Sequence, residues 1–152
     1  MIGASTASVR NEVPPHIRAQ AELELRRRYA PARASLKGFT QATMANIQWG
    51  WFQERLCREL DQFLLDVAAG LNPRVMFIAP PRHGKSEIAS RRFPAYTFGR
   101  NPKTNFIACS YAAPLAQRMN RDVQRVLDMP VYRRIFPDTR LHPSNITTLS
   151  GQ

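Results

Sequence analysis

The clearest regularity in the chain is a helical spacing of apolar residues that begins near Trp49. Apolar side chains recur every three or four positions, which places them on one face of a helix. Gly70 and Asn72 interrupt the spacing and predict the end of this helix. The residues of the apolar face are Phe52, Leu56, Leu60, Phe63 and Val67.

Two short apolar runs, residues 75–78 and 105–111, show no polar alternation and predict strands. Such runs are typical of strands buried on both faces of a parallel sheet. Each run is followed by a segment of helical composition, first over residues 87–92 and then from Pro114 to about Leu127. This alternation of strand and helix predicts an α/β fold in which helices flank a parallel sheet.

The remaining segments predict less regular structure. We expect a disordered tail over residues 1 to about 15, a basic helix over residues 17–29 and a connector over residues 31–47. Residues 93–98 continue the preceding helix, and the Gly-Arg-Asn-Pro run that follows ends it in a turn. The chain therefore divides at residue 48, into a basic, partly disordered and helical N-terminal extension, 1–48, and an α/β domain, 49–152.

The loop between the first predicted strand and its helix carries the most specific chemistry. Residues 80–87 read PPRHGKSE, and Gly84, Lys85 and Ser86 match the end of a P-loop. In a P-loop, backbone N–H groups surround the phosphates, the lysine reaches the β and γ phosphates, and the hydroxyl binds Mg²⁺. Ala79 stands where the pattern has its first glycine. The alternative is an ordinary turn between strand and helix with a solvated lysine.

Charge narrows the choice of partners. The net charge is +11, from 22 Lys and Arg against 11 Asp and Glu, and the excess lies at the two ends of the chain. This balance favours sequence-independent attraction to polyanions such as nucleic acid, although a merely soluble basic surface has the same composition. Arg118, Arg121 and Arg125 share one face of the helix after Pro114, where DNA, a neighbouring subunit or solvent would meet them.

The cysteines and the hydropathy indicate a cytoplasmic protein. Cys57 and Cys109 lie far apart in apolar surroundings, so we expect both to be buried free thiols without a metal or a disulfide. No apolar run approaches the roughly 18 residues that a membrane span needs. The N-terminus has no apolar segment typical of a secretory signal.

Several stretches beside the P-loop match one family. They are residues 80–87 (PPRHGKSE), 93–96 (FPAY) with 99–102 (GRNP), 110–111 (SY) with 115–116 (LA), and 132–137 (YRRIFP). On these stretches, which lie between residues 49 and 141, the chain resembles the large terminase subunit of tailed bacteriophages. In that family the phosphate loop commonly lacks its first glycine and contains a basic residue, which agrees with Ala79 and Arg82.

The resemblance implies a motor that uses ATP and Mg²⁺ to thread double-stranded phage DNA through the portal into the procapsid. It also implies a homo-oligomer, a small terminase subunit as partner, a nuclease that cuts the concatemer, and a location in the host cytoplasm at the portal. Lys85 would bind phosphate, Ser86 would hold Mg²⁺, and Arg82 would also stabilise transition-state charge. The nucleotide-binding residues would be Pro81, Arg82, His83, Gly84, Lys85 and Ser86. Apart from the resemblance, the start of the helix before the loop, residues 51–53, would let Gln53 reach the adenine ring, although an aromatic stripe at helical spacing is more often core.

The expected catalytic machinery is incomplete. An ATPase of this kind needs a further strand that ends in acidic residues, which complete the Mg²⁺ site and orient water. From residue 112 onward the acids are Asp122, Asp128 and Asp138, and none ends an apolar run. We expect the front half of an ATPase domain that binds ATP but hydrolyses it negligibly, without the acidic strand or the nuclease. The alternative is an inactive prophage remnant or a basic nucleic-acid-binding module.

Overall fold

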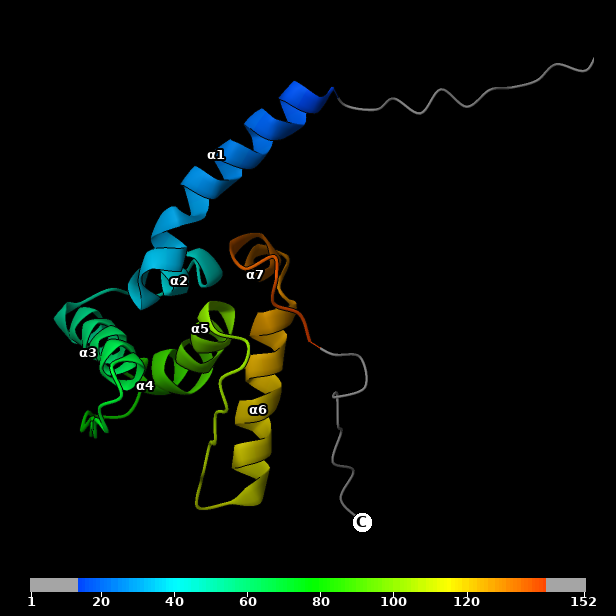
Figure 1. Cartoon of the computed structure of the whole chain (residues 1–152). Coiled ribbons are helices and arrows are strands. Elements are labelled where there is room, and N and C mark those ends of the chain that lie inside the picture. The colour runs from blue at the N-terminus through cyan, green and yellow to red at the C-terminus, as the bar shows by residue number, and fades with distance from the viewer. Residues whose placement is uncertain (1–13, 142–152) are drawn as a thin grey trace, which may run out of the picture.

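The computed structural model describes residues 14–141, which form an assembly of helices (Figure 1). In chain order the elements are α1 (Pro15–Ala34), α2 (Leu36–Thr43), α3 (Trp51–Ala68), α4 (Lys85–Glu87), the π-helix η1 (Ile88–Arg92), α5 (Phe93–Arg100), α6 (Ala113–Asp128) and α7 (Pro130–Ile135). The junctions between α4, η1 and α5 keep helical dihedral angles, so these three elements form one continuous helix over residues 85–100.

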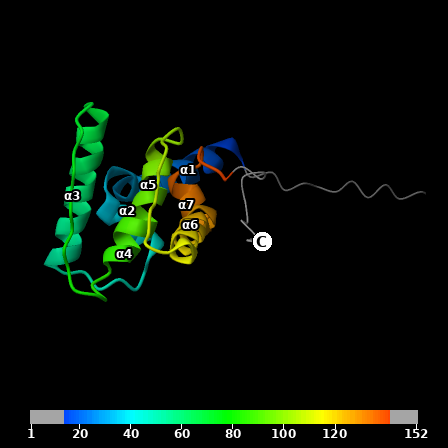
Figure 2. The ribbon, with the colours of Figure 1, turned by 90° about the horizontal axis from the view of Figure 1, so that it is seen from below.

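The predicted parallel sheet is wrong, because the described part of the chain contains no strand. An extended segment becomes a strand by hydrogen bonding to a neighbour, and within residues 14–141 neither 75–78 nor 105–111 forms a backbone ladder. Figure 2 shows the chain leaving α3 and returning to α4 as coil. Most of the apolar side chains are open to solvent, with Met76 84%, Ile78 89% and Ile107 87% exposed, whereas Phe77 and Phe106 pack against other apolar side chains. The α/β class is therefore replaced by a helical one.

The predicted connector over residues 31–47 is wrong over 31–34, which belong to α1, and over 36–43, which form α2. Ser35 caps the helix, since its hydroxyl oxygen accepts a hydrogen bond from the Gly38 N–H at 3.1 Å. The Asp61 carboxylate of α3 accepts from the Leu36 N–H at 3.0 and 3.1 Å. These bonds satisfy donors that a helix start leaves open. Burial of Leu36 and Phe39 then stabilises a segment whose buried positions follow a helical spacing but include two threonines, Thr40 and Thr43.

The other predicted helices are confirmed. Helix α3 buries Leu56 and Leu60 from the predicted apolar face, and Gly70, at a φ of +77°, follows its end. Helix α1 extends the predicted basic helix in both directions, and α6 covers the predicted helix after Pro114. Residues 1–13 of the predicted tail lie outside the described residues.

An aromatic cluster joins α2, α5 and the end of α7. Its ring centroids lie 5.4 to 6.2 Å apart, and the members are Phe39, Tyr96, Tyr132 and Phe136. The Tyr132 hydroxyl donates to the Ala95 carbonyl at 3.0 Å, so its polar end is satisfied within the core. Gly99 is needed beside Phe136, because a Cβ atom at that position would overlap the ring. The cluster therefore holds the C-terminal half of the continuous helix.

Helix α1 is attached to the core through its last turn. The Arg33 guanidinium donates to the carbonyl oxygens of Ile135, at 2.6 Å, and Arg134, at 3.1 Å. A positive group at the C-terminus of α7 satisfies open carbonyls and complements the helix dipole. Tyr29 and Ala32 are the buried residues of α1, and its first turns project away from the other helices (Figure 1).

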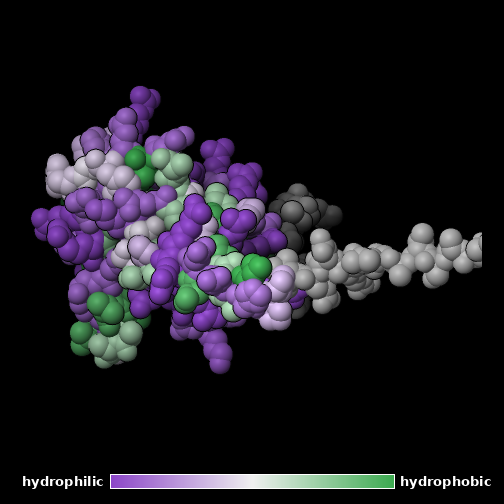
Figure 3. Space-filling model, turned by 90° about the horizontal axis from the view of Figure 1, so that it is seen from above, coloured by the Kyte–Doolittle hydropathy of each residue, from purple (hydrophilic) through white to green (hydrophobic). Residues whose placement is uncertain are grey.

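The surface is mainly hydrophilic and carries small hydrophobic patches, as one face shows in Figure 3. Among the helices of residues 14–141, none combines the length and the apolar character needed to cross a bilayer. Cys57 is buried as predicted, whereas Cys109 is exposed. The prediction that Cys109 is buried was wrong because the segment 105–111 joins no sheet within residues 14–141.

The two thiols are expected to react at very different rates. Burial raises the pKa of Cys57 to about 12, with a smaller contribution from Asp61, and the reactive species is the thiolate. A colorimetric disulfide reagent at pH 8 should therefore modify Cys109 in the native protein and Cys57 only after unfolding. The Cys109→Ser variant is the matched control and should leave almost no fast phase. A fast phase that survives in this variant would contradict the buried position of Cys57.

Candidate functional site

The residues of the predicted P-loop, 80–86, lie where the coil after α3 meets the continuous helix 85–100. Gly84 precedes α4 at a φ of +73°, and Arg82 adopts a φ of +66°, which is uncommon for a residue with a side chain. Left-handed residues that alternate with residues of negative φ turn successive N–H groups toward one side, as in anion-binding nests. The strained conformation of Arg82 is of the kind found at functional loops.

Lys85 folds back over this loop. Its ammonium donates to the Ala79 carbonyl at 3.2 Å, and the side chain is half-buried. Ser86, the next residue, is exposed. A cavity of about 440 Å³ lies at the loop, and its lining consists of residues 80–87 together with Arg91. The structure thus brings together all the predicted loop residues and adds one arginine from η1.

Gln53 connects α3 to the loop. Its side-chain N–H donates to the His83 carbonyl at 3.1 Å, and its side-chain oxygen accepts from the Gly50 N–H at 3.0 Å. The His83 ring lies edge-on to Phe52, with 6.4 Å between centroids, and its Nδ1 lies 3.0 Å from the Pro81 carbonyl. Both polar ends of the Gln53 amide are therefore bound to backbone. One N–H and one lone pair of the amide have no partner in these two bonds, and these are what Gln53 could offer to an adenine ring.

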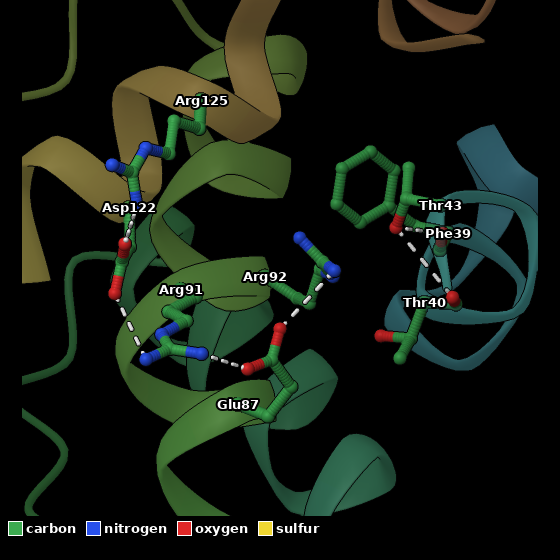
Figure 4. Close-up of polar contacts among 8 residues, drawn as sticks. All are labelled: Phe39, Thr40, Thr43, Glu87, Arg91, Arg92, Asp122 and Arg125. Atoms are coloured by element: carbon green, nitrogen blue, oxygen red, sulfur yellow. Dashed lines mark hydrogen bonds and ion pairs between the residues drawn. The ribbon is translucent and has the colours of Figure 1, made fainter. Parts of the chain in front are cut away.

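A chain of alternating charges includes Glu87 and Arg91, which line the loop cavity (Figure 4). The Glu87 carboxylate pairs with Arg91 and, at 3.1 Å, with Arg92. Arg91 also pairs with Asp122 of α6 at 2.8 Å, and Asp122 pairs with Arg125 at 3.0 Å. The chain therefore runs from the interior to the surface, because the side chain of Arg92 is 8% exposed and that of Arg125 is 75% exposed.

Arg92 is the buried end of this chain and points toward α2 in Figure 4. Burial lowers the pKa of its guanidinium, and the Glu87 charge acts in the opposite direction. Within residues 14–141 its Nε and the hydroxyl oxygen of Thr40 are buried without a hydrogen-bond partner. A buried cation keeps its charge only when it is paired, so Glu87 is a structural requirement for Arg92 as well as a neighbour of the loop.

Sequence reasoning missed this chain of charges. The spacing of Glu87 and Arg91, four residues apart, is a signal for a helical ion pair. Asp122 was noted only as an acid that ends no apolar run, whereas the structure pairs it with two arginines. Asp128 pairs with Arg133 at 2.7 Å, and neither of these two acids lines the cavity at the loop.

Comparison with known families gives one match. Residues 76–151, half of the chain, match the family described as terminase large subunit, T4likevirus-type, N-terminal. The chain belongs to this terminase family. Neither the curated proteins nor the solved structures give a match. The match confirms the resemblance inferred from the sequence, and the matched region contains the predicted P-loop residues, Arg91 and Asp122. Gln53 lies outside the matched region of this terminase chain.

Replacing Gln53 distinguishes loop positioning from adenine recognition. The Gln53→Glu variant keeps an acceptor for Gly50 but loses the donor to His83, so the loop becomes less ordered. Affinity for both MgATP and inorganic tripolyphosphate should fall by about fivefold, from the roughly 1 kcal/mol of one hydrogen bond. Calorimetry with both ligands is the measurement. An adenine contact would instead weaken only ATP, because tripolyphosphate has no base.

Proposed function

We propose that this terminase chain binds MgATP at residues 80–86. The observation that carries the proposal is the loop itself, where Gly84 is left-handed, Lys85 folds over the cavity, and the continuous helix 85–100 begins. Backbone N–H groups at the start of a helix attract anions. Lys85 would move from the Ala79 carbonyl to the β and γ phosphates, because three phosphate groups offer a stronger acceptor than one neutral carbonyl.

The residues present fit a nucleotide with its metal ion in part. The Ser86 hydroxyl is exposed beside the loop cavity and would provide one Mg²⁺ ligand, with phosphate oxygens and water as the others. Arg82 is exposed and would add positive charge near the phosphates, and Pro81 and His83 would shape the loop around them. Bound Mg²⁺ supplies charge neutralisation for the phosphates.

The terminase family supports a role in packaging phage DNA. We propose that ATP binding in this chain serves that role, in the host cytoplasm at the procapsid portal, with a homo-oligomer and a small terminase subunit as partners. Hydrolysis in the complete machine would drive double-stranded DNA into the procapsid. The second candidate, a basic nucleic-acid-binding module without turnover, is favoured by the net charge of +11 and by the exposed Arg118 and Arg121 of α6.

Substitution of Lys85 tests nucleotide binding. Lys85→Ala should weaken MgATP binding about tenfold or more, since hydrogen bonds to charged groups contribute about 1.5–3 kcal/mol each. Lys103→Ala is the matched control, because Lys103 is an exposed lysine outside the loop cavity and should leave the affinity unchanged. Isothermal calorimetry measures both. Equal affinity of the unchanged protein and the Lys85→Ala variant would reject the P-loop assignment.

Binding to duplex DNA should be independent of sequence and should weaken as salt rises. Removing two phosphate contacts with the Arg118→Gln/Arg121→Gln double variant should reduce the slope of log affinity against log salt by about two. The double variant Arg55→Gln/Arg58→Gln removes equal charge from α3, which lies across the molecule from α6 in Figure 1. Fluorescence anisotropy with two unrelated duplexes is the measurement. The same slope in both double variants would exclude the α6 face as the contact.

A further inference from the structure

Arg91 is the one residue of the cavity lining that comes from beyond Glu87. Its guanidinium is divided between two carboxylates, with NH1 on Glu87 and NH2 on Asp122 of α6 at 2.8 Å. We propose that Arg91 is a phosphate-contact residue of the candidate site and that Asp122 competes with the bound phosphate for it. The occupancy of the loop and the attachment of α6 are thereby coupled. This inference rests on the proposed binding of ATP.

The two carboxylates hold Arg91 differently. Glu87 also pairs with the buried Arg92, whose only anionic partner among the described residues is Glu87, so its position is fixed by the core. Asp122 instead shares its charge with Arg125, an exposed residue that stays paired if Arg91 leaves. Release of Asp122 is therefore the smaller loss. Arg91 is also the more accessible member of its pair, with 37% of its side chain exposed against 14% for Asp122.

The chain of alternating charges carries a net positive charge that a phosphate would neutralise. Three guanidinium groups, of Arg91, Arg92 and Arg125, face two carboxylates, of Glu87 and Asp122. An anion in the cavity beside Arg91 would balance the remaining positive charge. A guanidinium has five N–H donors and binds phosphate through two parallel bonds, so Arg91 suits this ligand better than a lysine would.

The coupling has a direction that follows from this competition. When phosphate takes Arg91, α6 loses its ionic contact with η1 and keeps its apolar contacts through Val123 and Val126. The exposed arginines of α6 then belong to a helix that is held less tightly. By linkage, a partner that pulls α6 away from Arg91 strengthens nucleotide binding, and the nucleotide strengthens binding of that partner by the same factor.

The test is calorimetry of MgATP and of inorganic tripolyphosphate with a set of variants. Asp122→Asn should tighten binding of both ligands by about two- to fivefold, which corresponds to the up to about 1 kcal/mol of a partly exposed ion pair. Arg91→Gln should weaken binding, and adding Asp122→Asn to Arg91→Gln should give no gain. Asp128→Asn is the matched control, since it removes the same charge from α6 but breaks only the pair with Arg133.

Unchanged affinity in Asp122→Asn, or an equal gain when Arg91 is already Gln, would overturn the inference. If Asp122→Asn does not fold by circular dichroism, the comparison of Arg91→Gln with Arg91→Lys decides. Weaker binding in Arg91→Gln that Arg91→Lys partly restores supports the contact, and an unchanged Arg91→Gln overturns it. Lys85→Ala separates the proposal of ATP binding from the proposal about Arg91. If Lys85→Ala fails to bind while Asp122→Asn binds like the unchanged protein, ATP binding stands and the role of Arg91 falls. Absence of binding by the unchanged protein overturns both.

Discussion

Burial of Tyr96 in the aromatic cluster is the contact on which the arrangement of the site depends. Tyr96 is fully buried and packs against Phe39 of α2 and Phe136 after α7. Aromatic pairs of this kind contribute about 0.5–1.5 kcal/mol each beyond the area that they bury. Because Tyr96 lies on the same continuous helix as Lys85, fixing one end of this helix in the core sets the direction of the other end. The loop is therefore positioned by residues from three distant parts of the sequence.

The elements that could be predicted from the sequence are those whose signals are local. The spacing of Phe52, Leu56 and Leu60 predicted α3, because helical periodicity is visible within a few turns. Strand formation depends on a partner elsewhere in the chain, which an apolar run such as 75–78 does not identify. The run 105–111 likewise has no partner strand among the described residues, and Cys109, which lies in it, is therefore exposed. Helix α2 escaped prediction although Ser35 is a local start signal, because two of its four buried positions are threonines and the bond from Leu36 to Asp61 is tertiary.

The candidate site likewise combines residues that a local sequence pattern indicates with contacts that form only in the folded chain. The tripeptide at Gly84–Ser86 is contiguous, so the sequence alone indicated it as a candidate P-loop, and the terminase family inferred with it is confirmed. The contacts that shape the loop are tertiary. Gln53 reaches His83 across thirty residues, and Arg91 meets Asp122 on a separate helix. No spacing rule predicts either contact, so their chemistry became visible only in the folded chain.

The π-helix η1 changes the angle about the helix axis between the loop residues and the core residues of the continuous helix. At its end the Phe93 N–H bonds to the Ile88 carbonyl, five residues back instead of four, so one turn contains an additional residue. Each residue of an α-helix rotates the chain by about 100°. Without the wide turn, a helix held by Tyr96 would present Lys85 and Ser86 to a different side of the molecule. One inserted residue thus sets the orientation of the candidate loop independently of the packing that anchors it.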